Sequence, residues 1–441
     1  MPNDEEPRAC YAFDIRSRFL GSRVGCSVNQ STLRAAWIIV GLLWAVAVLN
    51  YLDRQLLVTM ARPIKAELEI ADARFGLFSS IFLWVYGICS PFAGYLADRV
   101  GRKPVIITSL AIWSAATLLT GFVTNSTQML VARAFLGVSE AFYMPAAVAL
   151  IVDHHTGRTR SRATGLHLSG VYVGSVLGGL GGWFAEQFGW RFAFVLFGSI
   201  GIGYALVLII VLRVPDVDSV SDGPIQPPAG PGIANFSHPG NPFQALLTTR
   251  GFVLLLLMNA LNGAAYWPVR NWLPSFFNFE LGVSLTWSGV YGAMTFNAAA
   301  FGGMLIGSTL SDWWALRTPR ARALIPGIGF CLAAPCLFSV GLASYVPVII
   351  GGILIVGMSQ GFLDANLMPA VCTVADIRHR ATGYGLLNFV GTTAGGIMTF
   401  VGGWLKEANI PFGVTFQVAA GFILVAGLLL FLVKPRSVRI Q

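Results

Sequence analysis

The sequence is poor in charged residues. Asp, Glu, Lys and Arg make up 11% of the 441 residues, whereas hydrophobic residues make up 55%. A soluble globular protein has roughly a quarter of its residues charged. The shortage excludes an ordinary soluble domain and predicts a membrane protein. The formal net charge of +9 arises from short basic runs between apolar segments, so we expect no nucleic acid partner.

Several chemical motifs are also absent from the sequence. The six cysteines form no CxxC pair, and there is no nucleophile elbow, phosphate-cradling loop or zinc-binding pattern. We therefore expect a chain that is not an enzyme, uses no cofactor and binds no metal. Residues 1–30 have no apolar core, so we expect no signal peptide there.

Long apolar segments are what the sequence has in abundance. About twelve are long enough to cross a bilayer as helices, and a polar, Pro- and Gly-rich stretch separates six from six. The predicted fold class is an all-α membrane protein with twelve transmembrane helices in two six-helix bundles. The expected parts are a tail at 1–33, a bundle over 34–213, a linker over 214–249, a bundle over 250–434 and a tail at 435–441.

Basic residues in the connecting loops predict the orientation. The runs "DRVGRK", "GRTRSR", "RTPRAR" and "RHR" all come after even-numbered spans. Because cytoplasmic loops are rich in Lys and Arg, we expect both termini and the linker to be cytoplasmic. The lipid bilayer is the expected surroundings, and a monomer is the expected working unit.

The two halves of the sequence repeat each other. "RSRATG" at Arg160 recurs as "RHRATG" at Arg378, and small residues recur every fourth position over 170–182 and 391–403. This spacing places small side chains on one helix face and lets a neighbouring helix approach closely. Parallel repeats of six helices predict two pseudo-symmetric bundles with a binding site between them near mid-depth.

Two motifs show a resemblance to a known family. "GYLADRVGRK" (94–103) resembles, at every position, the signature loop of the major facilitator superfamily. "NYLDR" (50–54) with "RAFLGVSEAFYMPAA" (133–147) resembles its branch of anion:cation symporters and Spinster-like transporters. The resemblance extends over about 34–434 and implies the superfamily fold and secondary transport by alternating access. Because the resemblance is to compact bacterial members, it also implies the cytoplasmic membrane of a bacterium as the location.

The resemblance also implies a role for the signature loop. The family uses this loop as a charge cluster that holds one end of the two halves together, and Asp312 marks a partial copy in the second half. The expected gating residues are Gly94, Asp98, Arg99, Gly101, Arg102, Lys103 and Asp312.

Charged residues inside the predicted spans are the main functional candidates. Placing a charge inside a bilayer costs free energy, so such a residue usually has a function. Asp53 and Arg54 are adjacent, so their side chains point about 100° apart on a helix. We expect one to face the cavity and the other a neighbouring helix. Arg54 would offer a fixed positive fork to a substrate carboxylate, phosphate or sulfonate. Glu140 lies mid-span on the same face as Arg133, seven residues earlier.

Asp53 and Glu140 are the predicted proton-coupling residues, because partial burial favours a neutral carboxyl group. Protonation of Glu140 would release Arg54 to the substrate anion, which is a symport mechanism. The alternative is a buried ion network that only holds two helices together.

Further polar residues are predicted to contact substrate. Arg270 is either a second anion clamp, as in organophosphate:phosphate antiporters, or an interfacial arginine. Trp267, Pro268, Trp272 and Pro274 around it predict a broken helix end. Asp364 is either a second titratable group or part of the cavity wall. The remaining predicted contacts are polar or amphipathic residues inside the spans: Tyr51, Tyr86, Tyr143, Tyr172, Asn297, Gln360 and Asn388.

The predicted function is proton-coupled symport of a small organic anion, such as a sugar acid or another carboxylate. Three alternatives stay open. One is a Spinster-like transporter of lysophospholipids or related amphiphiles, which needs an apolar sub-pocket. The others are an organophosphate:phosphate antiporter and a membrane sensor that transports nothing.

Overall fold

The structure is a computed structural model that describes residues 30–155, 158–212, 242–318, 320–375 and 380–434. Most of the predicted N-terminal tail, most of the predicted linker and the predicted tail at 435–441 lie outside these residues. Gly94 and Asp98 of the predicted gating motif lie on a described helix, but the side chain of Asp98 and the surroundings of Gly94 lie outside the description.

Twelve helices in the described residues are long and apolar enough to span a membrane. In the first half these are α1 (Gln30–Thr59), α3 (Asp72–Val100), α4 (Arg102–Thr120), α5 (Ser126–His154), α6 (Arg158–Gly178) and α8 (Trp190–Val211). In the second half they are α10 (Arg250–Phe279), α12 (Thr295–Ala315) with the turns before it, α13 (Ala321–Val340), α14 (Val346–Val374), α15 (Arg380–Glu407) and α16 (Phe412–Leu432). The predicted all-α class is confirmed.

Short helices connect or extend the spans. They are α2 (Ala61–Glu67), α7 (Gly181–Phe188), α9 (Pro242–Leu247), α11 (Leu285–Ser288) and the π-helical η2 (Gly289–Met294). The sequence analysis predicted one span where the structure has α6 and α7, and one span where it has α11, η2 and α12. Hydropathy does not detect a break between two apolar helices.

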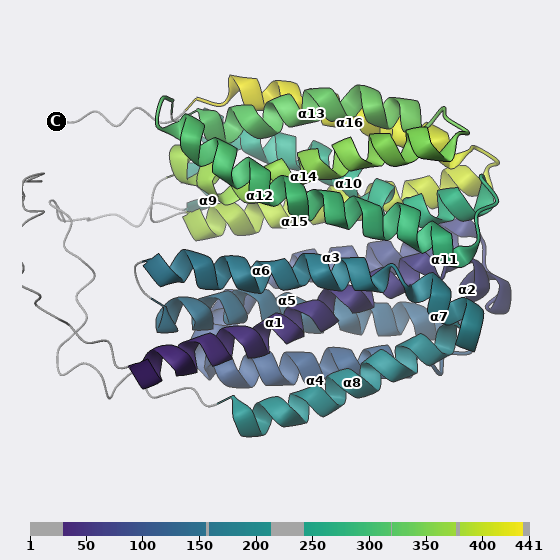
Figure 1. Cartoon of the computed structure of the whole chain (residues 1–441), viewed down its shortest axis with the longest axis horizontal. Helices are drawn as coiled ribbons and strands as arrows, with labels where there is room; N and C mark the ends of the chain where they lie inside the picture. The colour runs from purple at the N-terminus through teal and green to yellow at the C-terminus, as the bar shows by residue number, and fades with distance from the viewer. Residues whose placement is uncertain (1–29, 156–157, 213–241, 319, 376–379, 435–441) are drawn as a thin grey trace, which may run out of the picture.

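The helices form two bundles that lie side by side (Figure 1). Elements α1 to α8 build one half and α9 to α16 the other. The halves meet mainly where α3 runs along α15 and where α6 packs near α12. The α3–α15 contact includes hydrogen bonds from Ser80 Oγ to the Gly396 carbonyl at 2.7 Å and from Trp84 Nε1 to the Thr393 carbonyl at 3.3 Å.

Small residues allow close packing inside each half. A Cβ atom on Gly174 of α6 would overlap the backbone of Val48 in α1. In the second half, a Cβ atom on Gly263 of α10 would overlap the backbone of Gly391 in α15. The predicted small-residue faces of the two repeats are therefore confirmed, and each packs on the first spanning helix of its own half.

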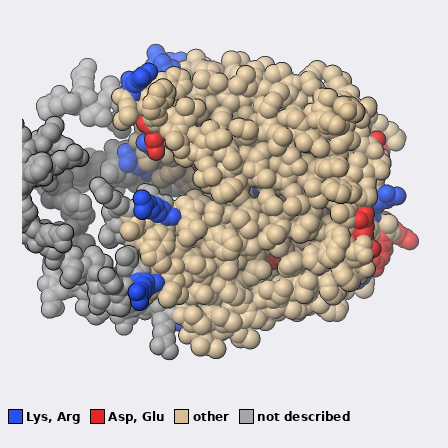
Figure 2. Space-filling view, viewed as in Figure 1, with Lys and Arg blue, Asp and Glu red and all other residues tan. Residues whose placement is uncertain are grey.

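The two ends of the molecule differ in charge (Figure 2). We call the end where α3 meets α4 and α12 meets α13 the basic end, because most of the visible Lys and Arg residues lie there. The opposite end, called the acidic end, carries Glu67, Glu186 and Glu280. The side that faces the viewer in Figure 2 shows almost no charge between the two ends, as expected of a surface that faces lipid.

The halves are closed on each other at the acidic end. Glu186 of α7 accepts hydrogen bonds from the backbone N–H of Leu285, at 2.7 Å, and from the hydroxyl of Thr286. A Cβ atom on Gly289 would overlap the Gly179 carbonyl oxygen, and one on Gly179 would overlap Met294 Cγ, so both glycines are required for this close contact.

The halves separate toward the basic end, where the surface is hollowed between them (Figure 2). Asp364 and Tyr384 are exposed there. Asp364 nevertheless bonds to a residue of the opposite half, so it lines an open space between the halves. We call this space the vestibule.

Candidate functional site

Arg54 and Glu140 form a buried ion pair in the first half. The distance from Arg54 Nε to Glu140 Oε2 is 2.5 Å. The guanidinium carbon of Arg54 also lies 4.6, 4.9 and 4.7 Å from the ring centroids of Tyr51, Phe82 and Tyr86. Aromatic faces attract a cation and fix its plane. Arg54 is therefore held in one orientation by a carboxylate and three rings.

Asp53 points away from Arg54, as the helical spacing predicted. Its Oδ2 accepts a hydrogen bond from the hydroxyl of Thr117 in α4 at 3.1 Å, and the residue is 3% exposed. The arginine thus pairs with Glu140 from α5, and its chain neighbour Asp53 faces α4.

Arg270 lies deep in the protein, which excludes the interfacial alternative. α10 runs unbroken through Pro268 and Pro274 to Phe279, so the predicted broken helix end is wrong. Both prolines are buried inside the bundle, where prolines within a membrane helix are tolerated. Arg270 therefore sits more than two turns before the end of the helix.

The guanidinium of Arg270 joins the two halves. Its Nε donates to Gln55 Oε1 at 3.2 Å and its Nη2 donates to Ser175 Oγ at 3.1 Å, both in the first half. Its Nη1 donates to the Tyr266 hydroxyl at 3.0 Å on its own helix. Arg54 and Arg270 also approach the same ring, that of Tyr51, at 4.6 and 5.9 Å from its centroid.

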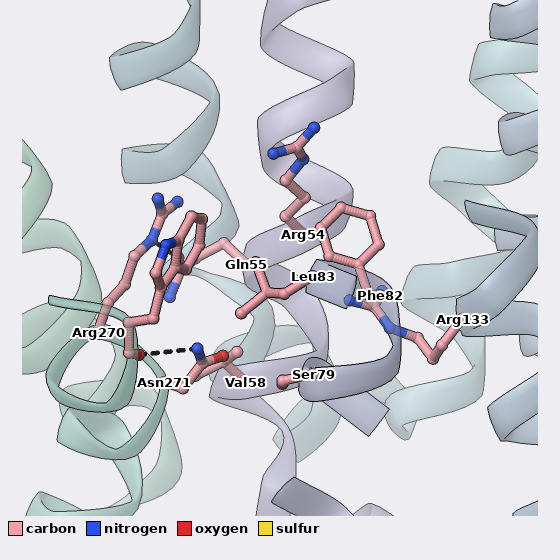
Figure 3. Close-up of a pocket in the computed structure, with 10 residues that line it drawn as sticks. Arg54, Gln55, Val58, Ser79, Phe82, Leu83, Arg133, Arg270 and Asn271 are labelled. Atoms are coloured by element: carbon pink, nitrogen blue, oxygen red, sulfur yellow. Dashed lines mark hydrogen bonds between the residues drawn. The ribbon is translucent and has the colours of Figure 1, made fainter. Parts of the chain in front are cut away.

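A small cavity lies between these arginines, on the acidic side of the vestibule (Figure 3). Three arginines and no carboxylate line it among the residues that the structure describes. The lining residues are Arg54, Gln55, Val58, Ser79, Phe82, Leu83, Arg133, Trp267, Arg270 and Asn271. Such a lining suits an anion, because guanidinium groups form strong hydrogen bonds to carboxylates and Arg270 bonds only to neutral groups among the described residues.

Sequence reasoning assigned only Arg54 and Arg270 of these residues to the site, and Arg133 and Gln55 are two polar residues among the others that make notable contacts. Arg133 lies over the Phe82 ring at 4.9 Å and donates to the Phe78 carbonyl at 3.4 Å. Its spacing of seven residues from Glu140 was the available signal. Nothing comparable in the sequence pointed to Gln55, because a neutral glutamine next to two charged residues does not stand out as a candidate of its own.

Asp364 connects the halves on the vestibule side. The Tyr172 hydroxyl donates to its Oδ2 at 2.9 Å and Gln360 Nε2 donates to its Oδ1 at 3.0 Å. Asn388 lies on the same inter-half surface, where its Nδ2 donates to Ser90 Oγ at 3.4 Å. Tyr172 and Asn388 therefore belong to the inter-half surface, as does Asp364, and Gln360 holds Asp364 from its own helix.

Two predicted contact residues lie elsewhere. The Tyr143 hydroxyl donates to the Leu43 carbonyl at 2.7 Å inside the apolar core of the first half. Asn297 Nδ2 donates to the Ala293 carbonyl of its own helix at 2.7 Å, and the residue is buried. The structure does not bring either side chain to the arginine-lined cavity.

The signature loop lies at the basic end. Gly101 joins α3 to α4 with a φ of 97°, a backbone conformation that favours glycine. Arg102 donates to the Ala149 carbonyl at 2.7 Å and pairs with Asp153, both in its own half. Arg99 and Lys103 flank the same turn. In the second half, Asp312 pairs with Arg322 at 3.5 Å.

Comparison with known proteins identifies the fold. The sequence matches the Major Facilitator Superfamily over residues 43–399 and again over 294–440. It is 28% identical over 380 residues to an MFS-type efflux pump of Mycolicibacterium smegmatis, covering 85% of each chain. It is 25% identical over 398 residues to the D-galactonate transporter of Escherichia coli, covering 85% of this chain and 90% of that protein.

A solved structure has the same architecture. It is that of a bacterial homologue of the human lysosomal transporter Spinster, in an inward-facing and unoccupied conformation. The TM-score is 0.74 with 21% sequence identity, covering 90% of this chain and 97% of the other. At that identity, the likeness establishes the fold.

Proposed function

This chain belongs to the Major Facilitator Superfamily and is a multi-pass membrane transporter, and from that premise we propose that it carries a small organic anion together with a proton. The observation that supports the proposal most is the buried pair of Arg54 and Glu140 beside a cavity with three arginines. An anion attracted to this cavity competes with Glu140 for the same guanidinium. A sugar acid or similar carboxylate is the proposed substrate, and the similarity to a D-galactonate transporter supports that class.

The coupling works through the charge of Glu140. While Glu140 is ionised, its carboxylate occupies the Nε edge of Arg54. A proton on Glu140 removes that charge, and the guanidinium then bonds to the substrate carboxylate in the bidentate geometry that suits it. Binding of the proton therefore raises the affinity for the substrate, and binding of the substrate raises the affinity for the proton. This reciprocity is the thermodynamic requirement for coupling two ligands.

Asp53 is the proposed second proton site. One of its oxygens bonds to Thr117, and the other is buried without a hydrogen-bond partner among the described residues. A buried carboxylate oxygen without a donor favours the protonated form. Asp53 precedes Arg54 in α1 and Glu140 pairs with Arg54, so a proton on either carboxylate changes the net charge around that arginine.

We assign the basic end to the cytoplasm, since cytoplasmic loops are rich in Lys and Arg. The vestibule then opens to the cytoplasm and the contact of α7 with α11 closes the outer side. The bundles 34–213 and 250–434 would move as two bodies joined by the linker 214–249. In the opposite state the basic ends would meet, and the signature loop with Arg102 would contribute to that contact.

The Spinster-like alternative is favoured by one observation. A second small cavity lies inside the second half, and its lining is mostly apolar: Tyr266, Val269, Phe296, Phe330, Ala333, Val356, Gln360 and Ile423. Tyr266 also bonds to Arg270, so this cavity adjoins the arginines. An amphiphile with an anionic head would place its head at Arg270 and its tail here.

Uptake by proteoliposomes separates the two proposals. Purified protein is reconstituted, and radiolabelled D-gluconate or a labelled lysophospholipid is added under an inward proton gradient. The symport proposal predicts gluconate accumulation that collapses when a protonophore is added. Transfer of the lysophospholipid without gluconate uptake would favour the amphiphile transporter instead.

A further inference from the structure

Gln55 lies between Arg54 and Arg270, two of the three arginines that line the cavity (Figure 3). It comes directly after Arg54 on α1 and is 1% exposed. Its Oε1 accepts the hydrogen bond from Arg270 Nε at 3.2 Å. A guanidinium can only donate hydrogen bonds, so the amide oxygen must face Arg270 and the amide nitrogen must point the other way.

The amide nitrogen of Gln55 has no partner. Nε2 is buried and makes no hydrogen bond within the described part of the chain. Buried donors in proteins are nearly always paired, with protein groups, water or a ligand. An unpaired donor in the wall of a cavity therefore marks a place where a ligand oxygen can bind.

The neighbouring helix α6 holds this side chain in position. A Cβ atom on Gly178 would lie only 2.5 Å from Gln55 Cβ and 3.2 Å from its Cγ. The missing side chain at Gly178 thus makes room for the stem of Gln55. With its stem packed on α6 and its oxygen bonded to Arg270, the amide presents its nitrogen in one direction.

We propose that Gln55 is a substrate-binding residue, whose Nε2 donates a hydrogen bond to an oxygen of the anion while its Oε1 keeps Arg270 in place. This inference rests on the proposed function and adds a neutral donor to the charged ones. The substrate would then be an oxyanion with one oxygen bonded to a guanidinium and another to the Gln55 amide. Gln55 also connects substrate in the first half to an arginine of the second.

The Gln55→Glu variant tests whether the side chain at position 55 faces the substrate. Glutamate keeps an acceptor for Arg270 but puts a negative charge where the proposed donor sits. It would occupy the arginines as an internal competitor of the substrate. We expect the KM for D-gluconate to rise about tenfold or more, with Vmax changing less. A wild-type KM in this variant would show that the side chain at position 55 does not face the substrate.

Counterflow is the assay, because it exchanges labelled for unlabelled D-gluconate at equal pH and needs no net proton movement. Gln417→Glu is the matched control, since Gln417 is a half-buried glutamine of α16 outside the site. We expect its KM to be unchanged. Gln55→Met, which removes donor and acceptor without adding charge, should raise the KM severalfold if Gln55→Glu does not fold.

The outcomes are distinct. A wild-type KM in either folded Gln55 variant overturns the assignment of Gln55 and leaves the symport proposal standing. Wild-type counterflow without any proton movement in the uptake assay overturns the coupling and leaves Gln55 as a binding residue. Absence of gluconate counterflow in the wild type overturns the proposed substrate class, and the Gln55 inference with it.

Discussion

At the scale of single residues, the site depends on which carboxylate holds Arg54. Glu140 pairs with Arg54 from another helix, whereas Asp53, the residue before Arg54 in the sequence, bonds to Thr117. Helix geometry alone predicted that the two adjacent charges point in different directions. It could not predict the partner of each, because that depends on how α4 and α5 pack around α1.

Arg54→Lys tests whether the fork of the guanidinium matters. Lysine keeps the positive charge but has no bidentate edge and fits less well between three aromatic rings. We expect the KM for D-gluconate to rise about tenfold or more. Radiolabelled uptake over a range of concentrations measures it. A lysine variant with wild-type KM would show that only charge is required.

The depth of Arg270 shows where residue patterns fail. Two prolines and two tryptophans around it are typical of a helix end at the membrane interface. In the structure the helix continues through both prolines, because the surrounding helices bury that segment. Whether a proline ends a helix or only kinks it is decided by tertiary packing, which the local sequence does not contain.

At the scale of helices, close contacts between glycines set the closed acidic end. Gly289 at the start of η2 faces Gly179 at the end of α6, and Gly182 faces Leu285. The recurring small residues of α6 were visible in the sequence. Their last member, Gly182, packs on the opposite half and not on α1, because the chain breaks between α6 and α7.

Gly289→Ala should weaken this closure. Its Cβ would collide with the Gly179 carbonyl, so the state closed at the acidic end loses stability relative to the open one. Spin labels at Glu69 and Glu407, exposed at the acidic end in opposite halves, report the separation. We expect a larger population of long distances in the variant.

Gly302→Ala is the control for that experiment, because open space surrounds the added methyl group in α12. Its distance distribution should match that of the unsubstituted protein. An unchanged distribution in Gly289→Ala would show that the glycine contact does not limit opening.

At the scale of the whole molecule, composition and repeats predicted nearly all of the architecture. The twelve spans, the two halves and their superfamily are predictable from hydropathy, from the recurring "RATG" segments and from the 94–103 motif. The conformation cannot be predicted from the sequence, because an alternating-access protein has at least two arrangements of the same helices. Only the structure shows closure at the acidic end and an open vestibule at the basic end.

Alternating access predicts opposite changes at the two ends when substrate binds. Spin labels at Arg160 and Leu316 report the basic end, and the pair at Glu69 and Glu407 reports the acidic end. With saturating D-gluconate at acidic pH, we expect the first distance to shorten and the second to lengthen in part of the population. A change of the same sign at both ends would contradict movement of two bodies about a central site.

Proton uptake by proteoliposomes tests the central claim most directly. Vesicles loaded with a pH-sensitive dye receive D-gluconate, with wild-type protein and Glu140→Gln compared side by side. The account predicts acidification of the wild-type lumen and none with the variant, which should still exchange gluconate by counterflow because Arg54 has lost its ionised partner. Gluconate uptake without acidification in the wild type, or equal acidification in both proteins, would contradict coupling through Glu140.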